Sequence, residues 1–198
     1  MASSDVEVCS NALVRIGASP VASLDEAADG AVLMKRFYLP TLRSRLREHA
    51  WNFAQYRVEL AELADEPVWD FAHQFQLPQD PYCLYLLETD LEDNEAWRIE
   101  TFKTSSSQYR VLVTDSASVK ILYVGLVEDV NLWDDLFVDA MEVELAWKAA
   151  YPLTRNATLL EELNKERERA WHKARSRDGQ EARALKKMLS TSLTTDVR

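Results

Sequence analysis

The spacing of the apolar residues changes twice along the 198-residue chain. In residues 5–16, and again in residues 131–171, apolar side chains recur every three or four positions, as on one face of a helix. Between residues 55 and 126, apolar and polar residues alternate in short runs, which is typical of half-buried strands. This order predicts an α+β protein in which a small antiparallel β-sheet is inserted into an antiparallel helical bundle.

Four segments follow from this pattern. We expect two N-terminal helices of the bundle in residues 1–54, a β-rich insertion in 55–128, two C-terminal helices in 129–175 and an extended C-terminal arm in 176–198. Residues 190–198 have no apolar periodicity, so this end is expected to be free or to fold on a partner. The arm is therefore expected to be dispensable for folding.

The first helix has signals at both ends. Ser4 or Asp5 can accept a hydrogen bond from the free N–H groups of the first turn. Gly17 stands where a left-handed residue would stop the helix, and Pro20 follows three residues later. The apolar stripe of this helix is Val6, Cys9, Leu13 and Ile16.

A second helix is predicted over residues 27–50, with Ser23 or Asp25 as the cap at its start. Pro40 falls inside it, so a kink or a short break is expected there. The predicted apolar stripe is Leu33, Phe37, Leu42, Leu46 and Ala50. The more polar side carries Arg36, Arg43, Arg45 and Arg47.

Five alternating runs predict strands in the middle of the chain. They are Tyr56–Leu60, Phe71–Leu77, Trp97–Phe102, Tyr109–Val113 and Val119–Val124. Residues 81–88 are apolar without alternation and fit either a strand or a helical turn.

Two further helices are predicted in the C-terminal part. Asn131 can cap the first, over residues 131–151. The second starts near Thr154 or Asn156, and its helical pattern extends to about Leu189.

Acidic residues gather around the start of the third helix. A calcium site needs oxygen ligands that converge on one point, and this group lacks the spacing and the glycine of an EF-hand loop. We interpret the group as a helix start, where the dipole favours anions, together with a solvated face. Its members are Asp129, Asp134, Asp135, Asp139, Glu142 and Glu144. A second solvated face of mixed charge is predicted at Glu161, Glu162, Lys165, Glu166, Arg167, Glu168 and Arg169.

The charge is unevenly distributed along the sequence. The formal net charge is −10, which argues against a protein that grips nucleic acid by its phosphates. Residues 175–198 hold six basic and three acidic side chains, a net charge of +3, so the rest of the chain carries −13. An acidic body with a basic tail indicates that the tail meets a separate partner.

No catalytic constellation can be recognised. The four glycines are scattered, whereas phosphate-binding loops need clustered glycines. The histidines, His49, His73 and His172, are far apart and are assigned surface or packing roles. Cys9 and Cys83 are expected to be buried free thiols, because no Cys-x-x-Cys zinc pattern is present. We therefore expect no enzymatic activity, no metal site and no cofactor.

Membrane insertion is not expected from this sequence. No apolar run approaches the roughly 20 residues that a membrane span needs. The N-terminal residues also lack a basic region followed by an apolar stretch, so no signal peptide is expected.

One stretch carries more specific information. Residues 11–24 read Asn-Ala-Leu-Val-Arg-Ile-Gly-Ala-Ser-Pro-Val-Ala-Ser-Leu, and a helix with regular arginines then ends in His49-Ala-Trp-Asn-Phe53. This pattern resembles the tail tubular protein A family of short-tailed phages, also called head-to-tail adaptor or gatekeeper proteins. Two positions depart from it: His49 replaces the usual arginine, and Pro40 is not expected in the second helix.

The resemblance implies a structural role in a virion. Members form a ring, usually of twelve copies, between the portal and the tail proteins, such as the tail tube or nozzle, and DNA passes through the ring without specific binding. The chain would be made in the cytoplasm of the bacterial host and incorporated into the neck of the particle. The alternative is another head-completion or tail-terminator assembly protein.

The resemblance also assigns roles to residues. Packing roles are implied for Ile16, Gly17, Pro20, Val21, Leu24, Trp51 and Phe53. C-terminal segments of the family commonly reach the portal, which makes this chain's basic tail the expected portal-binding arm. Its candidate residues are Arg183, Lys186, Lys187, Leu189, Leu193 and Val197. Ring closure is expected to place the first two helices of one subunit against the last two of the next, with Arg43 and Arg47 at the contact.

Overall fold

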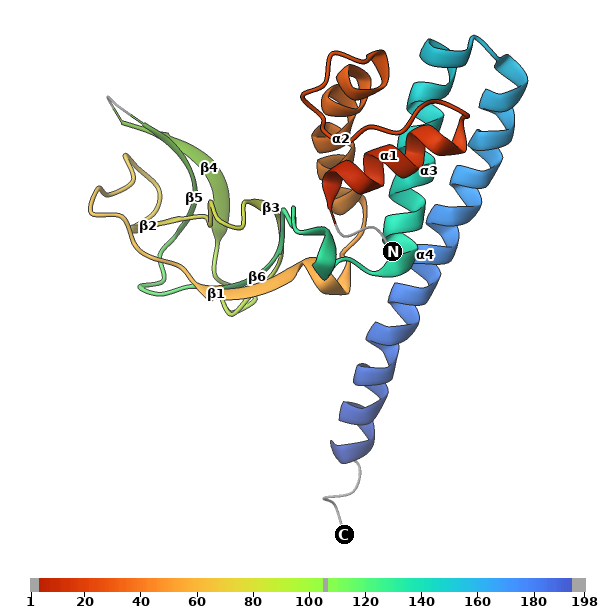
Figure 1. Cartoon of the computed structure of the whole chain (residues 1–198). Helices are drawn as coiled ribbons and strands as arrows, with labels where there is room; N and C mark the ends of the chain where they lie inside the picture. The colour runs from red at the N-terminus through yellow and green to blue at the C-terminus, as the bar shows by residue number, and fades with distance from the viewer. Residues whose placement is uncertain (1–3, 105–106, 194–198) are drawn as a thin grey trace. The chain divides into compact units, whose positions relative to one another are not determined.

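The computed structural model describes residues 4–104 and 107–193, with side chains as far as Glu181. The chain is 47% helical and 22% strand, which confirms the predicted α+β class. It forms two compact units. The helical unit comprises residues 1–53 and 127–198, and the β unit comprises residues 54–126 (Figure 1).

Helix α1 (Asp5–Arg15) begins and ends at the predicted signals. The Ser4 hydroxyl accepts a hydrogen bond of 3.2 Å from a backbone N–H of the first turn. Gly17 follows the helix with a φ of +73°. The Ala18 N–H then donates to the Leu13 carbonyl, which satisfies one of the acceptors that the last turn leaves open.

Helix α2 (Asp29–Glu48) differs from its prediction at the start. Its N-cap is Ala28, which forms no side-chain hydrogen bond, so neither Ser23 nor Asp25 caps it. The Ser23 hydroxyl instead accepts a hydrogen bond from the Asp25 N–H within the preceding loop. The helix continues through Pro40 without the short break that was considered, and this proline is exposed.

The buried face of α2 is shifted from the predicted stripe. Met34 and Tyr38 are buried, whereas Leu33 and Phe37 are only half-buried. The step from Phe37 to Leu42 is five residues, which turns about 140° around a helix and leaves the stripe. The observed face keeps the helical period throughout.

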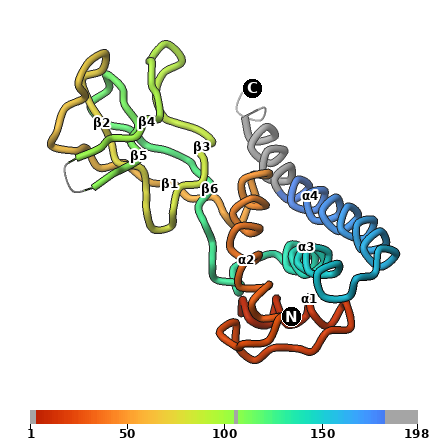
Figure 2. Tube along the Cα trace, turned by 90° about the horizontal axis from the view of Figure 1, so that it is seen from above, coloured from red at the N-terminus to blue at the C-terminus, as the bar shows by residue number. Residues whose placement is uncertain are grey.

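Helix α3 (Asp135–Thr154) contacts each of the other three helices. Figure 2 shows it nearly end-on, with the other helices on different sides of it. Its buried residues accordingly surround the axis instead of forming one stripe. Asp134 caps it, and Asn131, the predicted cap, lies in a 3-10 helix, η2 (Val130–Leu132), that is capped by Asp129.

Helix α4 (Ala157–Leu193) confirms the helical pattern expected to about Leu189, and it shows that residues 176–193 are helical where an extended arm was also predicted. Asn156 accepts a hydrogen bond from a first-turn N–H at 3.1 Å, which confirms one of the two predicted starts. The helix continues past Arg175 because residues 180–189 are mostly strong helix formers. Its buried face also continues, since Asp178 is buried.

The β unit contains two three-stranded antiparallel sheets in its described part, where a single sheet was expected. The strand orders are β1-β6-β3 and β2-β5-β4. All five predicted runs contain strands, and the ambiguous residues 81–88 contribute β3. The strands are β1 (Gln55–Glu59), β2 (His73–Gln76), β3 (Cys83–Thr89), β4 (Trp97–Lys103), β5 (Gln108–Thr114) and β6 (Lys120–Gly125), and the short 3-10 helix η1 (Asn52–Ala54) precedes β1.

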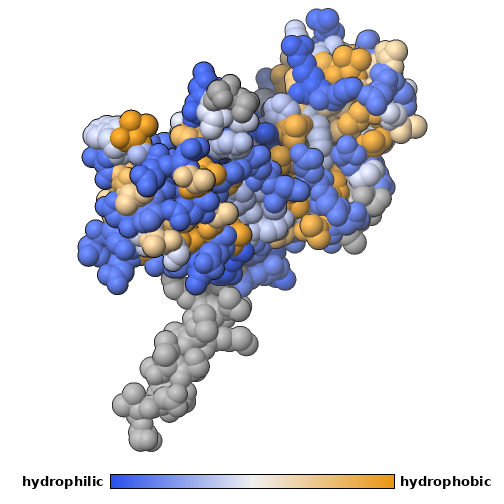
Figure 3. All heavy atoms as spheres, turned by 90° about the vertical axis from the view of Figure 1, so that its left-hand side faces the viewer, coloured by the Kyte–Doolittle hydropathy of each residue, from blue (hydrophilic) through white to orange (hydrophobic). Residues whose placement is uncertain are grey.

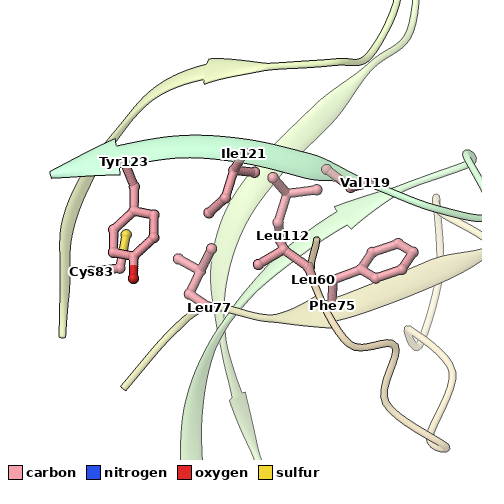
Figure 4. Packing of buried hydrophobic residues seen from close by; sticks show 8 residues of the cluster. All are labelled: Leu60, Phe75, Leu77, Cys83, Leu112, Val119, Ile121 and Tyr123. Carbon is pink, nitrogen blue, oxygen red and sulfur yellow. The ribbon is translucent and has the colours of Figure 1, made fainter. Parts of the chain in front are cut away.

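A shared apolar core explains why the strands separate into two sheets. Phe75 and Leu112 come from one sheet, and Ile121 and Tyr123 come from the other, and all four lie in one buried cluster (Figure 4). Two sheets that face each other bury both apolar faces, which a single small sheet cannot do. The cluster consists of Leu60, Phe75, Leu77, Cys83, Leu112, Val119, Ile121 and Tyr123.

Gly17 and Gly179 allow a matched test of the backbone conformation at the end of α1 and within α4. Gly17 has a positive φ and Gly179 lies within α4, and a Cβ added at either would meet no atom within 4 Å. Gly17→Ala should lower the free energy of unfolding by about 1–2 kcal/mol, because an L-residue is strained in the left-handed region. Gly179→Ala should raise it by about 0.5–1 kcal/mol through helix propensity. Denaturant unfolding measures both, and equal effects would contradict the assigned backbone.

Candidate functional site

The predicted motif residues differ in how deeply they lie in the helical unit. Three are buried: Ile16, Val21 and Trp51. Two are half-buried: Leu24 and Phe53. Gly17 and Pro20 are exposed at the end of α1, where their backbone conformation turns the chain. Five of the seven motif residues are thus buried or half-buried, and the other two lie in the turn after α1.

Trp51 joins three helices. Its indole N–H donates a hydrogen bond of 2.9 Å to the Arg45 carbonyl of α2. Its ring contacts Phe137 of α3 edge-to-face at 4.9 Å between centroids, and Trp171 of α4 at 6.0 Å. Phe53 packs on the same Phe137 ring at 5.0 Å. The Trp-x-Phe ending therefore fixes the end of α2 against α3 and α4.

Glu144 of α3 is the most buried carboxylate of the described residues, with 2% of its surface exposed. It accepts hydrogen bonds from Arg45 at 2.7 Å and from the Trp171 indole at 3.0 Å. Arg167 lies 3.7 Å away, and its guanidinium stacks 4.0 Å above the Trp147 ring. The prediction that Glu144, Arg45 and Arg167 lie on polar or solvated faces is therefore wrong.

Glu142 forms a second junction, two residues before Glu144 on α3 and therefore on nearly the opposite side of the helix. It accepts hydrogen bonds from Asn11 at 2.8 Å and from Arg15 at 2.9 Å, both on α1. Arg15 also pairs with Asp139 and, at 3.2 Å, with Glu166 of α4. Burial lowers the pKa of the Arg15 guanidinium, but its hydrogen bonds to Glu142 and Asp139 outweigh this effect and raise the pKa.

Asp178 attaches the second half of α4 to the end of α2. Its carboxylate accepts a hydrogen bond of 2.9 Å from the Asn52 N–H and lies 2.8 Å from His49 Nε2. Its backbone carbonyl accepts a further hydrogen bond of 2.9 Å from the Asn52 side chain. His49 therefore has a specific partner on α4.

Most polar groups of these junctions are engaged with one another, but Arg167 Nε is buried without a hydrogen-bond partner among the described residues. The two thiols are free and buried, as predicted, and burial together with Asp5 raises the pKa of Cys9 to about 12. His73 pairs with Glu62 of its own unit, and His172 is exposed on α4. Within the part of the chain that the structure describes, no three metal-ligating side chains gather. The arrangement holds the helices together.

The charged residues of these junctions can be identified from the sequence only when it is known which side of each helix faces the interior. From Met34 and Tyr38, the buried period leads to Thr41 and Arg45. On α4, the same reasoning leads from Leu163 to Trp171 and Asp178. Residue type alone places Glu144, Arg45 and Arg167 on solvated faces, whereas the helix phase turns them inward. The other charged residues predicted on the mixed-charge face of α4 are exposed.

The predicted portal-binding residues fall largely outside the description. The side chains of Arg183, Lys186, Lys187, Leu189 and Leu193 are not among those described, although their backbone belongs to α4. Val197 lies outside the described residues altogether. Asp178 shows that residues 176–178 belong to the packed helical unit, so any separable arm must start after them.

The two units divide the net charge unequally. The β unit holds thirteen acidic and five basic side chains, a net charge of −8 out of −10. The helical unit is nearly balanced. The acidic body inferred from the sequence is therefore mainly the β unit.

Comparisons with known proteins give no family assignment: no protein-family model and no curated protein matches this sequence. Among the described residues, no helix combines the length and apolar character that crossing a membrane requires.

Removal of the Glu144 carboxylate should be strongly destabilising. Glu144→Ala leaves two largely buried guanidinium groups without their acceptor, so we expect a loss of about 3–5 kcal/mol in the free energy of unfolding. Glu162→Ala, an exposed glutamate on α4, should change it by less than about 0.5 kcal/mol. Chemical denaturation compares the two variants, and similar values would refute the role of the junction.

Proposed function

We propose that this chain is a structural subunit of the head-to-tail adaptor of a tailed bacteriophage, which assembles as a ring, with twelve copies expected, between the portal and the tail. The observation that carries the proposal is the motif in residues 11–53. Its apolar residues pack inside the helical unit, and its Trp-x-Phe ending joins α2 to α3 and α4 through Phe137 and Trp171. The same residues carry the resemblance to the adaptor family.

The charged junctions support this role. Glu142 and Glu144 tie α1, α2 and α4 to the central helix α3. Such cross-links resist sliding of the helices, and a closed ring requires copies of one constant shape. We propose that the four helices form the antiparallel bundle that the family resemblance implies.

The distribution of charge is compatible with DNA passage. A net charge of −8 on the β unit offers phosphates few binding sites, so DNA can slide past it. The C-terminal end after Glu181 holds four basic side chains against one acidic side chain. In this proposal it pairs with acidic surface on the portal and orders on docking.

Electron microscopy of the chain mixed with its portal and tail proteins tests the proposal. A closed ring attached to the portal is the expected result. A complex with tail components alone would favour a tail-terminator protein, and binding to neither would overturn the adaptor assignment. An isolated monomer would be uninformative, because adaptor rings can require the portal as a template.

A truncation after Glu181 should separate portal binding from folding. It keeps Asp178 and its hydrogen bonds to Asn52, so the free energy of unfolding should change by less than about 1 kcal/mol. Portal binding, measured by co-sedimentation, should be lost. Lys186→Glu with Lys187→Glu in the full chain should weaken it without shortening α4. Undiminished binding by both variants would refute a portal-binding role for this end.

The matched control is truncation after Arg175. This variant loses Asp178 and leaves Asn52 without its partners, so it should be less stable than the truncation after Glu181 by about 1–3 kcal/mol. Thermal unfolding of the two proteins side by side distinguishes a folding defect from a binding defect.

A further inference from the structure

The loop between β1 and β2 presents two apolar side chains to solvent. Val68 is 94% exposed and Trp69 is 74% exposed, the two highest values among the large hydrophobic residues described. Hydrophilic residues predominate on the face of the molecule in Figure 3, and hydrophobic ones form small separate areas. Three carboxylates flank the exposed pair: Asp65, Glu66 and Asp70. We name residues 65–70 the acidic loop.

The base of the acidic loop is fixed by specific contacts. The Asp65 carbonyl accepts a hydrogen bond from the side chain of Gln74, which is 2% exposed. At the other end, Asp70 has a φ of +75°, and the N–H of Phe71 donates to the Trp69 carbonyl at 3.0 Å, which forms a γ-turn. A left-handed aspartate is strained, so the turn keeps Trp69 outward at an energetic cost.

A complementary surface lies on α2 of the helical unit. Val32 is 56% exposed and Leu39 is 40% exposed, seven residues apart on one face of the helix. Arg36 and Arg43, also seven residues apart and exposed, alternate with them along the same face. We name these four residues the basic face of α2.

The acidic loop and the basic face of α2 are complementary in apolar contact and in charge. Each combines two exposed apolar side chains with flanking charges, and the charges have opposite sign. The acidic loop cannot meet its own counterpart in a second copy favourably, because both belong to units with a net charge of −8. The basic face would likewise repel another basic face.

We propose that the acidic loop of one subunit docks on the basic face of α2 in a second copy of this chain. Trp69 and Val68 then cover Val32 and Leu39. The carboxylates of Asp65 and Glu66 face Arg36 and Arg43, whereas Asp70 pairs with Arg98 of its own unit at 4.0 Å. Two different patches in contact make a heterologous interface, which repeats from copy to copy and closes into a ring or continues as a filament. The contact itself does not depend on the adaptor role. Only the statement that it joins neighbouring subunits of a ring rests on that proposed function.

Disulfide trapping between two separately purified variants tests the contact. One variant carries Val68→Cys and the other Leu39→Cys, and they are mixed under mild oxidation at high protein concentration. The native thiols Cys9 and Cys83 are buried and remain outside the reaction. A mixed disulfide should form at least about tenfold faster than in the control mixture of Val68→Cys with Tyr151→Cys, because docking raises the local thiol concentration. Tyr151 is 49% exposed on α3 and lies on neither surface.

A charge swap in the same assay distinguishes docking from random collision. Arg36→Glu with Arg43→Glu on the Leu39→Cys copy should slow trapping by about tenfold. Asp65→Lys with Glu66→Lys on the Val68→Cys copy should restore it. Trapping no faster than the control, no response to the swap, or a dominant Val68→Cys homodimer would each overturn the proposal.

This assay is independent of the adaptor assignment. A ring bound to portal without loop trapping would refute this contact and leave the adaptor role intact. Loop trapping in a chain that binds no portal would support the contact and refute the adaptor role.

Discussion

The carboxylate of Glu144 is the constraint on which the helical unit most depends. A charge buried to this degree costs several kcal/mol unless cations and donors surround it. Arg45 comes from α2, and Arg167 and Trp171 come from α4, so the requirement can be met only when all three helices are in register. Trp171 and Trp147 in turn cover the two guanidinium groups. Apolar packing alone would tolerate small shifts of the helices, whereas this junction does not.

Local signals predicted much of the fold. The stop at Gly17, the cap at Asn156 and the positions of five strands all depend on residues next to each other in sequence. The number of sheets depends instead on which strands pair and which face each other across the core. The alternation of apolar and polar residues within a strand does not indicate its partners. Asn131 was mistaken for a helix cap because Asp129 and Asp134 cap two successive helices around it.

The candidate site was harder to predict than the fold. Trp51 could be identified as a packing residue from its motif, but Glu142 and Asp178 could not, since their partners are more than 120 residues away along the chain. The charged side chains of this protein serve two purposes. A few of those in the helical unit, such as Glu142, Glu144 and Asp178, form buried cross-links, and those of the β unit remain largely exposed and leave it strongly acidic.

The pairing of β1 with β6 has a consequence for how such a chain can change over evolution. The chain enters the β unit just before β1 and leaves it just after β6, and Gln55 at the entry is paired with Val124 near the exit. The two ends of the insertion thus lie side by side, in one residue pair at the end of the β1–β6 pairing. An inserted unit with adjacent ends can be exchanged or deleted, because the helical unit then has only a short loop to close. Closing a short loop costs little entropy. The helical unit would thereby keep its own core when the inserted β unit is exchanged.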